Sequence, residues 1–182
     1  LNLIQRLCGI ASISRKYVKL AHAYDVKILD TRKMTPGLRM FEKYAIAVGG
    51  AYNHRLNLSE GILIKDNHIR SAGSVIDAIQ YATESNSGLP LELEVDSLDQ
   101  ITDALTMQVD GFLLDNMPPN LIKEAVALIR NAEKGTEIFI EASGGITDKN
   151  LVSYLNTGIN AISVGAMTHS AISKDIRLEF IC

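Results

Sequence analysis

Short apolar runs recur along the chain from residue 26 onward, each three to five residues long. Most are β-branched or rich in leucine, which is typical of strands buried on both faces of a parallel sheet. We therefore predict six buried strands. They are Val26–Leu29, Ile62–Ile64, Leu91–Val95, Gly111–Leu114, Ile138–Ile140 and Ala161–Val164.

Between these runs, apolar side chains return at the spacing of an amphipathic helix. Pro118 and Pro119 suit the start of one such helix, and Asp148 lies near the start of another. Strands and helices that alternate over short connections indicate parallel βαβ units, and hence an α/β barrel or an open α/β sheet. The apolar sets of the predicted helices lie at Val75–Ala82, Leu98–Leu105, Leu121–Ile129 and Leu151–Leu155.

The two ends of the chain depart from this alternation. Residues 3–22 predict an amphipathic helix, either continuous or interrupted near Gly9. Lys174–Ile181 alternates polar and apolar residues, as a half-exposed antiparallel strand does. Because the sequence offers this strand no obvious partner, we expect its sheet to lie outside the chain. The predicted organisation is a linking helix at 1–24, an α/β barrel domain at 25–170 and a terminal strand at 171–182.

Polar residues and glycines gather directly after the predicted strands. The starts of the strands carry far fewer of them, which argues against the alternative that strands simply end where charges begin. In α/β barrels and open α/β sheets, ligands bind at this carboxyl edge. The segments concerned are Asp30–Lys33, Lys65–His68, Asp96, Asp115–Asn116, Glu141–Gly145 and Gly165.

Composition narrows the range of partners. The 18 Lys and Arg residues against 21 Asp and Glu give a net charge of −3, which argues against nucleic acid or an anionic membrane as partner. No apolar run approaches the ~18–20 residues that span a bilayer. Cys8 and Cys182 have no spacing that suggests a zinc site or a disulfide, so we expect a cytoplasmic protein. Leu1 at the start suggests a piece of a longer protein.

A basic set follows the first two strands and the segment between them. Arginine offers forked donors for carboxylate or phosphate, and lysine offers a point charge. If these residues converge, they form a pocket for a strongly anionic ligand; the alternative is a set of solvated surface charges. Lys65 could instead form a Schiff base, as in barrel aldolases. The set is Arg32, Lys33, His54, Arg55, Lys65 and His68.

An acidic set accompanies it, with Glu94 and Asp115 as its main members and Asp66 and Glu141 as less certain ones. Carboxylates beside an anion pocket suit a divalent metal held through substrate oxygens, ribose hydroxyls, or a developing positive charge on a sugar carbon. The alternative is a structural ion pair with a lysine or arginine.

Two glycine-rich turns complete the candidate site. Ser143-Gly144-Gly145 follows the fifth strand, and Gly165-Ala166 follows the sixth. Glycines let backbone N–H groups approach a phosphate closely, and barrels often bind phosphate at their last two strand–helix loops. His169 is a candidate cap for the same phosphate, although a lone histidine is more often structural.

Eight ordered motifs resemble the quinolinate phosphoribosyltransferase family over essentially the whole chain. The resemblance implies an incomplete TIM-like barrel of about six parallel strands, with a helix before it and the terminal strand belonging to an N-terminal sandwich domain. The motifs are LNxxQRLxGIA at 1–11, DTRKxTPGLR at 30–39, GGxxNHR at 49–55, IKDNHI at 64–69, EVD at 94–96, LLDN at 113–116, EASGGI at 141–146 and SVGAxTHS at 163–170.

The resemblance also implies an activity: quinolinate and phosphoribosyl pyrophosphate (PRPP) give nicotinate mononucleotide, pyrophosphate and CO₂ in NAD biosynthesis, with Mg²⁺ and in a homodimer. Lys65, Glu94 and Asp115 would be catalytic, with Glu94 and Asp115 at the metal, directly or through substrate or water. The quinolinate pocket would comprise Thr31, Arg32, His54, Arg55 and Lys65. Lys33 and Lys65 would meet the pyrophosphate. The 5′-phosphate would lie among Ser143, Gly144, Gly145, Gly165, Ala166 and His169.

Two alternatives remain within this resemblance. Family members carry an N-terminal domain and, just upstream of the position of Leu1, an arginine that helps to close the partner's pocket. A chain without them could be a non-catalytic phosphate-binding barrel. A molybdenum-associated paralogue group shares the early motifs, but we do not expect it to keep Lys65-Asp66-Asn67-His68.

Overall fold

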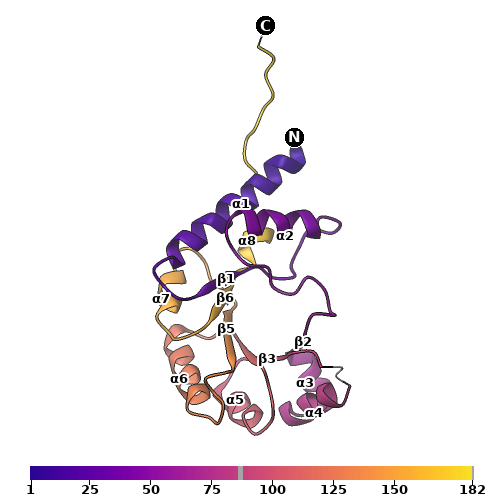
Figure 1. Ribbon diagram of the computed structural model, residues 1–182, viewed down its shortest axis with the longest axis vertical. Helices are drawn as coiled ribbons and strands as arrows, with labels where there is room; N and C mark the ends of the chain where they lie inside the picture. Colours follow the sequence, from indigo (N-terminus) through magenta and orange to yellow (C-terminus); the bar gives the residue numbers. More distant parts are fainter. Residues whose placement is uncertain (86–87, 182) are drawn as a thin grey trace.

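A single parallel sheet of six strands organises the protein, as the computed structural model shows for residues 1–85 and 88–181 (Figure 1). All six predicted strands are confirmed, with ends shifted by up to three residues. The strands are β1 (Lys27–Leu29), β2 (Ile62–Ile64), β3 (Leu91–Val95), β4 (Gly111–Asp115), β5 (Phe139–Ser143) and β6 (Ala161–Ser163).

The sheet curls into an incomplete barrel. Its order is β1-β6-β5-β4-β3-β2, so the first and last strands in the sequence are neighbours. On the free edge of β1, Tyr52 forms a parallel bridge with Leu29. From there to β2 the barrel is open, which confirms the predicted incomplete TIM-like fold.

The sheet has an apolar outer face and a polar inner face. Leu93, Phe112 and Ile140 are fully buried on the side that packs against the helices. In β3 these buried positions alternate with Glu92 and Glu94, which are only partly buried. The expectation that every strand is buried on both faces is therefore wrong, because the inner face of the barrel carries charged side chains.

Four predicted helices are confirmed, and they lie outside the curled sheet (Figure 1). Pro118 and Pro119 occupy the start of α6, as expected, since proline suits a first helical turn. Asp148 lies three residues before the first residue of α7. The helices are α4 (Val75–Ser85), α5 (Leu98–Ala104), α6 (Pro119–Arg130) and α7 (Leu151–Leu155).

Three further helices were not predicted: α2 (Arg39–Val48), α3 (Asp66–Ala72) and α8 (Ala166–His169). In α2 the usual amphipathic pattern is mixed. Ala45 and Ile46 are buried, but so are Glu42 and Lys43, while Met40, Phe41, Tyr44 and Val48 are exposed. The residues after β2, read from the sequence as a strand end, open helix α3. Lys65 is its N-cap.

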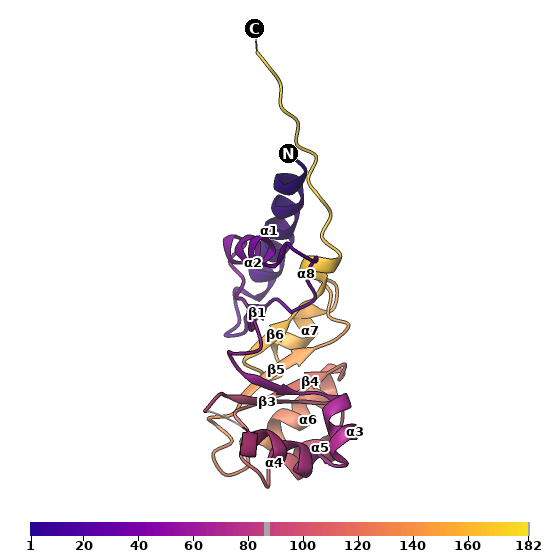
Figure 2. The same cartoon turned by 90° about the vertical axis from the view of Figure 1, so that its right-hand side faces the viewer.

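Helix α1 (Asn2–Ala21) is continuous through Gly9. A Cβ at Gly9 would lie 2.2 Å from the carbonyl oxygen of Ile172, so the glycine allows the C-terminal segment to pass close by. That segment runs alongside α1 and then extends beyond it (Figure 2). No helix in the described part of the chain is both long and apolar enough to cross a bilayer.

The strand predicted at 171–182 is not formed in this chain. Residues 171–181 have no regular secondary structure, and Cys182 lies outside the described residues. Three hydrogen bonds tie the segment to α1. Lys174 N donates to Gln5 O at 3.0 Å, Gln5 Nε2 donates to Ile176 O at 2.9 Å, and Arg6 Nη1 donates to Ala171 O at 3.0 Å. Alternation alone does not make a strand without a partner, and its pairing with a sheet outside the chain stays a prediction.

Candidate active site

A pocket of about 690 Å³ lies at the carboxyl ends of the strands, and every residue predicted for the substrate site lines it. The residues come from seven separate parts of the sequence, so the sheet gathers them as the strand-end argument predicts. They are Thr31, Arg32, Lys33, His54, Arg55, Lys65, Glu94, Asp115, Ser143, Gly144, Gly145, Gly165, Ala166 and His169.

One member of the basic set and one less certain acidic candidate lie outside this pocket. Asp66 is exposed at the start of α3, where its carboxylate lies 3.6 Å from Arg70, so its placement in the acidic set is wrong. His68 lines a neighbouring groove of about 740 Å³ beside β2 and α4. Its Nδ1 accepts a hydrogen bond from the Lys65 backbone N–H at 2.9 Å, so it supports the turn that carries Lys65.

A buried ion pair fixes the two segments that carry the arginines. Lys43 Nζ donates to Asp30 Oδ1 and to the carbonyl oxygen of His54, both at 2.8 Å. The His54 backbone N–H donates to the same Asp30 oxygen at 2.7 Å. Burial raises the pKa of Asp30, although Lys43 and His54 act to lower it. This pair therefore joins the end of β1 to the segment that ends in Arg55.

The Lys33 loop is held from two other sides. Thr168 Oγ1 donates to the carbonyl oxygen of Lys33 at 2.7 Å. Two residues later, Thr35 donates to the buried Glu42 carboxylate through its N–H at 3.0 Å and its hydroxyl at 2.7 Å. Arg6 neutralises that carboxylate at 3.0 Å. The loop after β1 thus reaches the pocket in a defined conformation.

Glu94 and Asp115 share the inner face of the sheet. Glu94 pairs in register with Leu113, and Asp115 follows Leu113 by two residues, so both carboxylates project from the same side. Lys65 forms an ion pair with Glu94, so the structural pair weighed as an alternative does exist, at the pocket wall. Asp115 accepts from Asn116 Nδ2 at 2.7 Å. Carboxylate oxygens are the kind of hard ligand that Mg²⁺ prefers.

The glycines have the conformations that the turns require. Gly144 has φ 89° and Gly145 has φ 61°, in the left-handed region that glycine favours. A Cβ at Gly144 would lie 2.3 Å from Asn116 Oδ1, so the turn packs directly against the loop after β4. Gly165 faces the His169 ring, whose Nδ1 lies 2.6 Å from Ser170 Oγ. The two turns thus line the pocket with little side-chain bulk.

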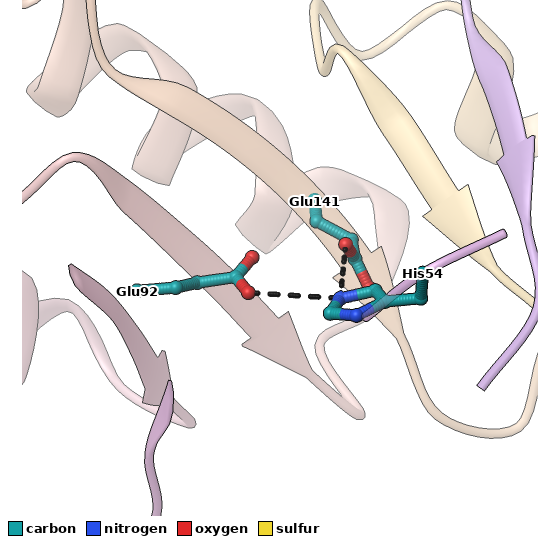
Figure 3. Close-up of side chains that lie close together, drawn as sticks. All are labelled: His54, Glu92 and Glu141. Atoms are coloured by element: carbon teal, nitrogen blue, oxygen red, sulfur yellow. Dashed lines mark ion pairs between the residues drawn. The ribbon is translucent and has the colours of Figure 1, made fainter. Parts of the chain in front are cut away.

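A cluster on the inner face was only partly found from the sequence. His54 Nε2 lies 3.2 Å from Glu141 Oε2 and 3.6 Å from Glu92 Oε2 (Figure 3). Glu141 belongs to β5 rather than to the loop after it. Glu92 was missed, although the alternation in Leu91–Val95 places it on the same face as Glu94.

The protonation of His54 is subject to opposing demands. Burial lowers its pKa, but hydrogen bonds and charges from Glu141 and Glu92 outweigh burial and raise the pKa to about 9. The Arg55 backbone N–H, however, donates to His54 Nδ1 at 2.8 Å, which requires a lone pair on that atom. A pKa of about 9 favours the charged ring at neutral pH, whereas the contact from the Arg55 N–H favours the neutral ring with its proton on Nε2.

Comparison with known proteins decides the family. A sequence model of the quinolinate phosphoribosyl transferase C-terminal domain matches residues 10–179. The chain belongs to this family. It is 43% identical to a probable carboxylating nicotinate-nucleotide pyrophosphorylase of Bacillus subtilis over 98% of its length, and 41% identical to the enzyme of Mycobacterium leprae, also over 98%. The resemblance found in the motifs is thereby confirmed.

Solved structures of family members have the same fold. NadC from Streptococcus pyogenes matches 96% of the chain with a TM-score of 0.87 and 43% identity. The nicotinate-nucleotide pyrophosphorylase from Ehrlichia chaffeensis matches the same share with a TM-score of 0.90 and 41% identity. The chain spans 61% and 62% of the two bacterial relatives, and 60% and 62% of these two structures.

Proposed function

We propose that this member of the quinolinate phosphoribosyltransferase family is a carboxylating nicotinate-nucleotide pyrophosphorylase. It would convert quinolinate and PRPP to nicotinate mononucleotide, pyrophosphate and CO₂ in de novo NAD biosynthesis. The observation that carries the proposal is the pocket itself. In it Arg32, Arg55 and Lys65 line the same cavity as Glu94 and Asp115.

The charges suit the two substrates. Quinolinate carries two carboxylates, for which Arg32, His54, Arg55 and Lys65 beside Thr31 offer the donors. Lys33 and Lys65 are placed to meet the pyrophosphate of PRPP. The low bulk of the two glycine-rich turns supports the 5′-phosphate position at Ser143, Gly144, Gly145, Gly165, Ala166 and His169.

The chemistry needs stabilisation of charge more than a nucleophile on the protein. The ring nitrogen of quinolinate attacks the sugar carbon as pyrophosphate leaves, so positive charge develops on the ribose. The Glu94 and Asp115 carboxylates favour that charge, and the Lys33 and Lys65 ammonium groups favour the leaving group. Mg²⁺ held by Glu94 and Asp115, directly or through substrate or water, would supply further stabilisation of the pyrophosphate.

Turnover by the purified protein tests the proposal. With quinolinate, PRPP and Mg²⁺, it should release pyrophosphate and CO₂ in equal amounts. Arg55→Ala and Lys65→Ala should each lose about 2–5 kcal/mol of transition-state stabilisation, the usual cost of removing a desolvated charge contact. Unchanged turnover in either variant would contradict the role given to that residue.

A non-catalytic phosphate-binding barrel is the second candidate function. It is retained because the chain spans only 61% and 62% of the two bacterial relatives. Calorimetry separates the two: binding of both substrates without turnover supports this candidate, and binding of neither contradicts both. A Schiff-base role for Lys65 is disfavoured, because its ammonium group is paired with Glu94. Absence of borohydride trapping would exclude that role.

We further propose a homodimer that works in the cytoplasm. Exposed apolar side chains on α2 and at both ends of the chain support self-association, since large apolar patches commonly mark interfaces. Sedimentation of the purified protein should give a dimer mass, and a monomer at micromolar concentration would count against it. These side chains include Leu3, Ile4, Met40, Phe41, Tyr44, Val48, Leu178 and Phe180.

A further inference from the structure

The His54 ring connects three separate parts of the fold. Its Nδ1 accepts the Arg55 backbone N–H, and its Nε2 faces two carboxylates that come from different strands (Figure 3). Glu92 belongs to β3 and Glu141 to β5, with β4 between them. His54 itself follows Tyr52, which forms the bridge with Leu29 of β1, by two residues. Both ring nitrogens are therefore engaged by the protein.

The Glu141 carboxylate is unfavourable for the fold alone. The residue is 1% exposed, and burial raises its pKa even though His54 acts to lower it. One of its oxygens, Oε1, has no hydrogen-bond partner among the described residues, and the same holds for Glu92 Oε1. A buried charge with incomplete hydrogen bonding costs stability, so a neutral side chain would serve the sheet better. This cost indicates a role in the site.

The charges of the cluster also influence Arg55. Burial and then the charge of Arg32 lower the pKa of Arg55, whereas the charges of Glu92 and Glu141 act to raise it. One guanidinium nitrogen, Nη1, donates to the carbonyl oxygen of Gly61, just before β2, at 2.6 Å. The Nε–H is buried without a partner among the residues described, and the side chain lines the pocket. The Arg55 Nε–H is therefore available to donate a hydrogen bond to a ligand in the pocket.

We propose that Glu141, assisted by Glu92, is a positioning residue that acts through His54 to fix Arg55 for an acid group of the substrate. The inference rests on the proposed function, because the acid group concerned is a carboxylate of quinolinate. Glu141 itself need not touch the substrate. The Glu141 carboxylate contacts the His54 imidazole, and the imidazole accepts a hydrogen bond from the Arg55 backbone N–H. The charges of the two carboxylates also offset the repulsion between Arg55 and Arg32.

The test compares Glu141→Gln with Glu124→Gln, which removes an exposed carboxylate from the outer helix α6. The purified protein is titrated with quinolinate and with PRPP by calorimetry. Glu141→Gln should weaken quinolinate binding on the order of tenfold, as loss of an orienting partner commonly does. PRPP binding should change little, and Glu124→Gln should leave both unchanged.

Thermal unfolding adds a readout that a purely structural role would not give. Because the carboxylate is unfavourable in the fold, Glu141→Gln should unfold at the same temperature as the wild type or higher. A lower unfolding temperature with equal losses for both ligands would show a structural role and overturn the inference. In the double variant with His54→Gln, quinolinate binding should be no weaker than in His54→Gln alone, since both act through one unit.

The remaining outcomes separate this inference from the function on which it rests. A wild type that binds no quinolinate contradicts the proposed function. If the wild type and Glu141→Gln bind quinolinate equally tightly, the positioning role is contradicted and the proposed function is not. The ligand atoms of His54, Glu92 and Glu141 also lie within 4.8 Å of one another, as in a metal site. Tight binding of Mn²⁺ alone, lost in Glu141→Gln, would assign the cluster to a metal and overturn the positioning role.

Discussion

Replacing Lys43 by methionine should destabilise the protein more than any exposed charge substitution. Lys43 is 3% exposed and its partner Asp30 is fully buried, so Lys43→Met leaves a carboxylate in the core without its counter-ion. Breaking a buried pair from one side costs about 3–5 kcal/mol. The loss of the hydrogen bond from Lys43 to the His54 carbonyl adds to it. Since domains are stable by roughly 5–15 kcal/mol, this is a large share of the total.

Urea unfolding at neutral pH measures this loss, with Asp30→Asn/Lys43→Met as the matched control. The double variant removes both charges and should recover most of the stability. The pH dependence gives an independent check. Burial already raises the pKa of Asp30, and without Lys43 the pKa rises further. Between the pKa of Asp30 in the unfolded state and its higher pKa in the folded state, the folded Lys43→Met protein binds more protons than the unfolded one. Its free energy of unfolding therefore falls as the pH rises through this range. A loss below about 1 kcal/mol, as for an exposed pair, would refute this account of the pair.

Three further outcomes are expected. Gly144→Ala should destabilise the protein by about 1–3 kcal/mol and weaken PRPP binding, because the residue has positive φ and its Cβ would clash with Asn116; unchanged calorimetry would contradict the phosphate position. Gly9→Ala should release the C-terminal segment, seen as faster amide exchange at residues 172–176, since its Cβ would overlap the Ile172 carbonyl; unchanged exchange would exclude that contact. Chelation by EDTA should abolish pyrophosphate release until Mg²⁺ is restored, and activity that persists in EDTA would refute the metal proposal.

Much of the fold was predictable because its signals are local. A strand such as Gly111–Asp115 is apolar over most of its length, and parallel strands bring their carboxyl ends to one edge whatever their exact register. The pocket residues could therefore be grouped from the sequence before their contacts were known. Pro118 and Pro119 marked the start of α6 for an equally local reason.

The features that were missed depend on tertiary structure. Helix α2 buries Glu42 and Lys43 beside Ala45 and Ile46 and exposes Met40, Phe41 and Tyr44, so its sequence does not show the pattern of an ordinary amphipathic helix. The charges are inside because Arg6 and Asp30 lie there to neutralise them, and no local pattern reports such partners.

The contacts among His54, Glu92 and Glu141 could not be predicted from the sequence for a related reason. Its carboxylates lie on β3 and β5, and only the sheet order and the path of the segment after α2 bring them to one imidazole. The terminal segment shows the opposite limit. Its alternation is strong, yet residues 171–181 form no strand without a sheet to join.

A structure of the protein with quinolinate and a non-hydrolysable analogue of PRPP bound tests the central claim most directly. The account predicts quinolinate carboxylates at Arg55 and Lys65, and the sugar 5′-phosphate at the Gly144–Gly145 turn, with the ribose between Glu94 and Asp115. Quinolinate in the neighbouring groove beside Tyr81, or a 5′-phosphate away from both glycine turns, would contradict it.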